Sequence, residues 1–227
     1  MSKKWISPVL MVGLGLFSTH GFAQTSVALS AYGAFHGTTI GHGTDQSPAN
    51  QAGGMIELRH IANPILGFEA TYSFNRADQK YTSAPGACPA FGCTISTEAV
   101  RANAHEVTAD WVPSLGIGSF RPFGVLGVGL LLDVPDDSQA TVITTTPCYT
   151  TPCPTNPTTT ASTATTTSTK AVYVYGAGLD WGLLPHLGLR VQYRGNLYQA
   201  PNVTSLFSST KTFTQTSEPM IGAYFNF

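Results

Sequence analysis

The sequence predicts an all-β protein, an eight-stranded antiparallel up-and-down transmembrane β-barrel, on three observations. Eight segments alternate apolar and polar residues, as a strand does when its two faces meet different surroundings. Their connections alternate between short and long, and only 10% of the 227 residues are charged. Beyond the N-terminus, no apolar run approaches the ~20 residues of a membrane helix. Strands closed into a barrel are the other way to satisfy every backbone group in lipid.

The first 23 residues have the features of a secretory signal peptide. Lys3 and Lys4 precede an apolar core, and a small-x-small cleavage site ends at Ala23. We expect cleavage after Ala23, which leaves residues 24–227 as one outer-membrane β-barrel domain. The formal net charge of −1 argues against nucleic acid as a partner.

The eight expected strands follow one another along this domain. Their approximate ranges are 26–36, 53–62, 65–76, 99–112, 120–132, 170–182, 187–198 and 219–227. The seventh alternates most clearly, because Leu189 and Val191 oppose Arg190 and Gln192. The fifth is apolar on both faces, so the sequence leaves its inward face open. Pro219 has no N–H to give to a ladder, which predicts that the eighth strand starts or bulges there.

The connections indicate which end of the barrel is which. Short connections cover residues 63–64, 113–119 and 183–186, whereas long ones cover about 37–52, 77–98, 133–169 and 199–213. Tight periplasmic turns and larger external loops are typical of outer-membrane barrels. In the third long loop, 14 of the 26 residues from 144 to 169 are Thr, so we expect it to be extended and mobile. It is either a surface stalk or a tolerated insertion.

The four cysteines form two local pairs with C-x4-C spacing. Cys88 and Cys93 fall in the second long loop, and Cys148 and Cys153 fall in the third. In an exported protein this spacing favours two small-loop disulfides. Metal binding is the alternative, although neither pair has a nearby His.

Charged and aromatic residues lie on opposite faces of the expected strands. A girdle of aromatic residues is expected on the lipid-facing phase near the strand ends; its members are Tyr72, Phe74, Trp111, Tyr173 and Trp181. An eight-stranded barrel is just wide enough for side chains to fill, and charges buried there must pair. The predicted lumen charge network consists of Glu57, Arg59, Glu69, Glu106, Asp110, Asp180, Arg190 and Arg194. It would fill and rigidify the barrel, and a gated ion path is the alternative.

Sequence signatures of catalysis are absent. The chain has no phosphate loop, nucleophile elbow or HExxH motif, and its six His residues are scattered. A lipid-modifying barrel enzyme would need a Ser/His-type site, and no expected strand places a Ser one or two residues from a His. We therefore expect no enzymatic activity, no cofactor and no metal.

The chain resembles the small eight-stranded outer-membrane barrels, the OmpX-like and OmpA transmembrane-domain-like proteins. The resemblance is carried by three segments, 172–182, 105–111 and 224–227. It implies a monomer in outer-membrane lipid that acts as a structural anchor or interacts with a surface ligand or host partner through its loops, with a porin-like diffusion channel as the alternative. It also implies that the barrel assembly machinery reads the last strand, through Ile221, Phe225 and Phe227.

Overall fold

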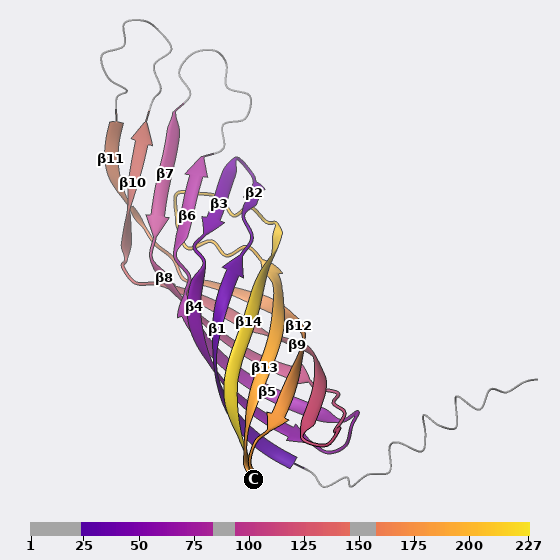
Figure 1. The fold of residues 1–227 in the computed structure, drawn as a ribbon. Coiled ribbons are helices and arrows are strands. Elements are labelled where there is room, and N and C mark those ends of the chain that lie inside the picture. The colour runs from indigo at the N-terminus through magenta and orange to yellow at the C-terminus, as the bar shows by residue number, and fades with distance from the viewer. Residues whose placement is uncertain (1–23, 84–93, 146–157) are drawn as a thin grey trace, which may run out of the picture.

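The structure, a computed structural model, describes residues 24–83, 94–145 and 158–227. Every regular element in those ranges is a β-strand, and none is a helix long and apolar enough to cross a membrane. Eight strands close into a barrel in the order β1-β14-β13-β12-β9-β8-β5-β4, in which all neighbours are antiparallel (Figure 1). The predicted fold class is confirmed.

The barrel strands match the expected segments within a few residues, with one exception. They are β1 (Gln24–His36), β4 (Gln51–Ile61), β5 (Gly67–Arg76), β8 (Ala102–Trp111), β9 (Phe120–Pro135), β12 (Ser168–Gly182), β13 (Leu187–Gln199) and β14 (Phe213–Asn226). The exception is β14, which was expected to start or bulge at Pro219 and instead begins six residues earlier.

Pro219 sits inside β14 because its missing N–H affects only one neighbouring strand. Its pairing with Tyr193 of β13 is continuous with the rest of that ladder. On the β1 side, the ladder stops at Tyr32–Met220 and resumes at Phe35–Ser217 in the same register. A residue in an antiparallel strand directs its N–H and C=O to the same neighbour, so the proline interrupts one ladder and leaves the other intact.

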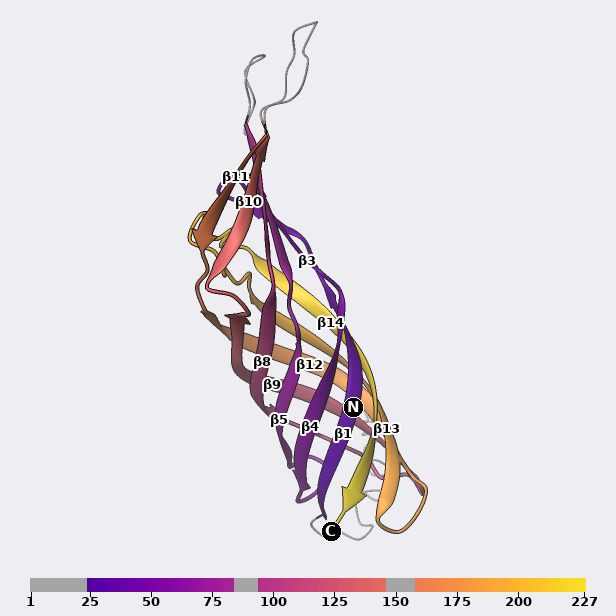
Figure 2. The same ribbon diagram turned by 90° about the vertical axis from the view of Figure 1, so that its left-hand side faces the viewer.

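A second sheet extends beyond the barrel at the end with the long connections. It contains β2 (Thr39–Gly41), β3 (Thr44–Pro48), β6 (Gln79–Ser83), β7 (Ile95–Val100), β10 (Gln139–Thr145) and β11 (Thr158–Ala164), in the order β11-β10-β7-β6-β3-β2. Figure 2 shows it projecting from one end of the barrel. We call this sheet the external sheet.

The external sheet corrects the expectation for the third long loop. Instead of a free extended segment, Thr158–Ala164 forms β11 and pairs with β10 over seven residue pairs. Threonine is β-branched and favours strands, so a Thr-rich segment can continue a hairpin although it cannot build a core of its own. The expected cysteine pairs and signal peptide lie outside the described residues.

The external sheet has a small core of its own. Tyr81, Val100 and Ala140 from three of its strands bury Val203 and Phe207 of the last long connection. The rings of Tyr81 and Phe207 stack with centroids 5.7 Å apart. Burial, followed by the nearby charge of Asp133, raises the pKa of the Tyr81 hydroxyl well above its usual value.

The barrel has an apolar outer face and a mixed interior. Leu29 and Val191 are more than half exposed, as the lipid-facing phase requires. The ambiguous fifth segment, β9, turns Phe123, Val125 and Leu131 inward. The interior therefore contains apolar side chains from β9 beside the charged side chains of other strands. The sequence did not predict these apolar side chains in the lumen, because β9 is apolar on both faces.

Candidate functional site in the barrel lumen

Two hairpins each supply one ion pair to the lumen near the end with the short turns. Arg59 faces Glu69 across the β4–β5 hairpin, with 2.6 Å between Nε and Oε2. Arg190 faces Asp180 across the β12–β13 hairpin, with 2.7 Å between Nε and Oδ1 and 3.0 Å between Nη2 and Oδ2. These pairs are local, because each joins residues ten positions apart.

The two hairpins are then joined across the lumen. Arg59 Nη1 lies 3.1 Å from Asp180 Oδ2, and Arg190 Nη1 lies 3.3 Å from Glu69 Oε2 and also donates to Glu57. Every member of this group is at most 5% exposed. We call these five residues the inner network. It crosses the lumen in the half nearer the short turns.

Two aromatic rings pack against the inner network. The Arg59 guanidinium carbon lies 4.0 Å from the centre of the Phe123 ring, and that of Arg190 lies 5.3 Å from it. Arg190 also lies 5.5 Å from the centre of the Tyr224 ring. Cation–π contacts of this kind stabilise desolvated guanidinium groups. Phe123 was missed from the sequence because the inward face of its strand was ambiguous.

Arg194 forms a separate group farther from the short turns. Its Nη1 lies 3.2 Å from Asp110 Oδ2, and its Nη2 lies 3.6 Å from Glu106 Oε1. Nη2 also donates to the Thr108 hydroxyl at 3.2 Å. All eight charged residues predicted for the lumen are therefore buried there, and every one takes part in an ion pair.

Two further buried acids lie toward the external sheet. Asp133 of β9 and Glu218 of β14 are 1% and 4% exposed. Both were missed because the expected strands ended at residue 132 and began at residue 219. Extending the eighth strand by one residue places Glu218 on the same phase as Met220 and Tyr224, whereas the fifth strand has no alternation that would place Asp133. Together with Glu106 they line a cavity of about 10 Å³, room for about one water molecule.

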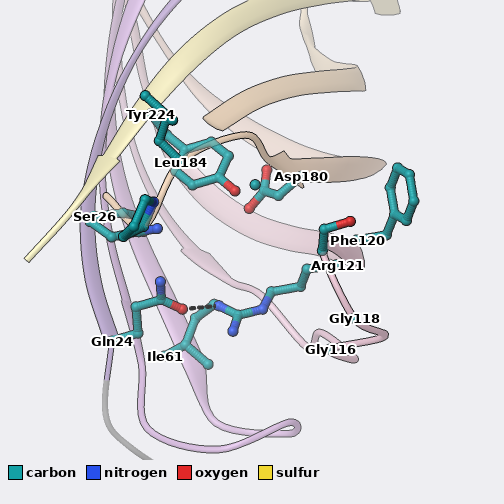
Figure 3. Close-up of a pocket in the computed structure, with 14 residues that line it drawn as sticks. Gln24, Ser26, Ile61, Gly116, Gly118, Phe120, Arg121, Asp180, Leu184 and Tyr224 are labelled. Atoms are coloured by element: carbon teal, nitrogen blue, oxygen red, sulfur yellow. Dashed lines mark hydrogen bonds between the residues drawn. The ribbon is translucent and has the colours of Figure 1, made fainter. Parts of the chain in front are cut away.

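A polar cavity of about 170 Å³ opens between the short turns and the inner network. Figure 3 shows Arg121 reaching into it and donating a hydrogen bond to Gln24, with Asp180, Ser26 and Tyr224 on the surrounding walls. Arg121 lies directly opposite Asp180 in the β9–β12 ladder, but it could not be predicted for the lumen because its strand is apolar on both faces. Polar cavities thus lie on both sides of the inner network.

The expected girdle residues are all outward and exposed. Trp111 and Trp181 lie near the short-turn end, whereas Tyr72, Phe74 and Tyr173 lie nearer the external sheet. Ile221, Phe225 and Phe227 share the outward face of the last strand, with Phe225 and Phe227 in edge-on contact at 5.3 Å.

The described ranges contain no cluster of metal-ligating side chains, and hydroxyl–imidazole contacts include Tyr72–His105 on the outer face. No group of three or more His, Cys, Asp or Glu side chains there could hold a metal ion. Hydroxyl–imidazole contacts occur at Thr25–His60, 2.9 Å, and at Thr216–His36, 2.9 Å. In the same ranges, neither imidazole has a carboxylate as a hydrogen-bond partner.

Comparison with known proteins identifies the family. The model of the outer membrane protein beta-barrel domain matches residues 9–215. The chain belongs to this family. It is therefore an outer-membrane β-barrel protein.

Solved structures of outer-membrane proteins have a similar fold but low sequence identity. Neisserial surface protein A is 13% identical with a TM-score of 0.46, covering 89% of this chain and 97% of its own. OprG from Pseudomonas aeruginosa is 11% identical with a TM-score of 0.48, covering 92% and 97%. The outer membrane protease OmpT from Escherichia coli is 8% identical with a TM-score of 0.41, covering 90% and 96%. No curated protein matches the chain.

Proposed function

We propose that the protein is a non-enzymatic surface-interaction protein, in which a closed barrel anchors the external sheet in the outer membrane. The observation that carries this proposal is the external sheet itself. It has six paired strands, a buried core and hydrogen bonds to the last long connection, so it presents an ordered surface. A barrel that served only to span lipid would need no such extension.

Hydrogen bonds join the external sheet to the last long connection. Glu98 of β7 is fully buried and accepts from the hydroxyls of Thr163 in β11 and Thr204 in the last connection. Gln46 of β3 donates to the carbonyl of Pro201 at 2.7 Å. The last connection thus ties strands from three hairpins together.

The surface role can be tested with a hairpin replacement. Residues 139–164 are exchanged for an Asn-Gly turn, and adhesion of cells expressing either chain is measured on heparin-coated surfaces. We expect the replacement to reduce adhesion while the barrel still migrates faster in SDS before heating than after. Equal adhesion of the two strains, at equal amounts of folded barrel, would contradict the proposal.

A narrow diffusion channel is the second candidate. The cavities toward the two ends of the lumen favour it, because a path through the barrel would have to cross only the inner network and the Arg194 group between them. Planar-bilayer recording distinguishes the two functions. A surface anchor should show no steady openings above leak, whereas a channel should show regular unitary steps.

The absence of catalysis is also part of the proposal. The fold alone does not decide this point, because barrels of this kind include enzymes as well as proteins without enzymatic activity. The hydroxyl–imidazole contacts of the described residues lack the third group that orients a catalytic base. Lipid A mass spectra from cells with and without the protein should be identical. A mass difference that disappears in a His60→Ala variant would contradict this part.

Export and the disulfides complete the proposal. We infer removal of residues 1–23 by cleavage after Ala23, and pairing of Cys88 with Cys93 and of Cys148 with Cys153. N-terminal sequencing of the outer-membrane form tests the cleavage site. Peptide mapping without reduction tests the pairs.

A further inference from the structure

The outer half of the lumen contains oxygen atoms that lack any partner among the described residues. Asp133 Oδ2, Glu218 Oε2 and Asn196 Oδ1 are buried and accept no hydrogen bond there. The three residues come from β9, β14 and β13, and all line the small cavity described above. Their side chains therefore meet at one position inside the barrel.

The assignment of the Asn196 oxygen follows from its other contacts. Its Nδ2 donates to both carboxylate oxygens of Glu106, at 3.2 and 2.9 Å. Reversing the amide would place an oxygen against that carboxylate, so Oδ1 has to point away from Glu106. The amide carbonyl is thus left as an acceptor at the cavity.

The positive groups nearby do not neutralise these acids. Arg194 already forms ion pairs with Asp110 and Glu106. Lys170, half-buried at the rim, acts on Asp133 electrostatically, but in the described ranges it makes no ion pair within 4 Å. His36 also lines the cavity, and its Nε2 has no partner among the described residues. A neutral imidazole carries one N–H and no positive charge, so it does not neutralise the acids. A buried carboxylate without a counter-charge costs several kcal/mol, so water alone is a poor occupant.

The cavity restricts the kind of counter-charge it can hold. Its volume of about 10 Å³ is close to that of a single water-sized particle, which excludes organic cations. Calcium takes six to eight oxygen ligands, usually with several carboxylates. No three acidic or His side chains of the described residues surround a common metal position, which argues against a divalent ion.

We propose that the outer half of the lumen binds one monovalent alkali cation of about the size of sodium, held by Asp133, Glu218 and the Asn196 carbonyl. Carboxylate and amide oxygens are suitable ligands for such a hard cation. The ion supplies one positive charge between β9, β13 and β14. None of the three proposed ligands belongs to the external sheet, and the site is independent of the proposed surface function.

The thermal stability of the full barrel in uncharged detergent tests this site. Melting temperatures are compared at pH 8 in sodium, potassium and N-methyl-D-glucamine chlorides of equal ionic strength. At a sodium concentration tenfold above its dissociation constant, we expect a Tm about 3–6 °C higher than in N-methyl-D-glucamine. Equal Tm in the three salts would overturn the proposal and indicate a proton in place of the ion.

Substitutions locate the effect. Glu218→Gln, and Asp133→Asn as a second variant, should remove the sodium-specific increase in Tm. Asp136→Asn is the matched control, because Asp136 pairs with Arg76 outside the lumen, and it should keep the increase. A sodium effect that persists in both lumen variants, or disappears in the control, would place the ion elsewhere and refute the assignment.

Discussion

Replacement of Arg190 by Met gives the sharpest test of the inner network. The substitution keeps most of the apolar stem but removes the guanidinium that binds Asp180, Glu57 and Glu69. Three buried carboxylates are then left with Arg59. Removing one partner from a buried ion pair costs about 3–5 kcal/mol, because the other charge stays buried.

That cost converts into a measurable change in thermal stability. For a domain of this size, each kcal/mol shifts Tm by roughly 2–4 °C, so we expect Arg190→Met to melt roughly 6–20 °C below the wild type. The assay is the loss of the fast-migrating form on SDS gels after heating in steps. Insertion into the membrane should be unaffected, because the outward face is unchanged.

A matched arginine provides the control. Arg76 also makes two ion pairs, with Asp136 at 2.6 Å and Asp78 at 3.8 Å, but its side chain is 48% exposed. Exposed pairs contribute about 0–1 kcal/mol, so Arg76→Met should change Tm by only a few degrees. Adding Glu57→Gln to Arg190→Met should recover part of the loss. If Arg190→Met and Arg76→Met melt alike, the inner network does not stabilise the barrel.

Three further predictions concern other parts of the molecule. Gly127→Ala should destabilise the barrel by about 1–3 kcal/mol, measured by the same melt, because an added Cβ would overlap Asp110 Oδ1; Gly116→Ala, with nothing within 4 Å of its added Cβ, should be neutral. Phe227→Ser should lower the amount of folded barrel in the outer membrane without lowering its Tm, and normal surface levels would remove Phe227 from the assembly signal. Glu98→Ala should make the external sheet sensitive to protease while the barrel stays heat-modifiable, because it removes the acceptor of two hydroxyl groups; equal protease resistance would contradict this role.

The sequence predicted the parts of the fold that depend on local pattern. Alternation identified the barrel strands, and the short turns set the register within each hairpin. The pairs Arg59–Glu69 and Asp180–Arg190 are direct cross-strand neighbours for that reason. Their inward direction follows from the polar phase of clearly alternating strands.

The features that could not be predicted from the sequence depend on contacts between strands that are far apart in the chain. Arg59–Asp180 and Arg190–Glu57 join residues 121 and 133 positions apart, so they depend on how the barrel closes. Phe123 was missed because a strand that is apolar on both phases gives no direction. The Thr-rich segment was misjudged because composition alone does not reveal that a neighbouring strand offers it a ladder.

The cross-lumen ion pairs also bear on what the inner network does. Strands β4 and β12 are four places apart in a ring of eight, so they form opposite walls of the barrel. In an open sheet Arg59 and Arg190 would each keep only the partner across its own hairpin, and Glu57 would lack a counter-charge. Closure brings the two hairpins together, so the network stabilises the closed barrel over an open one. A filled lumen is thus explained by the energetics of closure, and by itself it gives no reason to infer a gate.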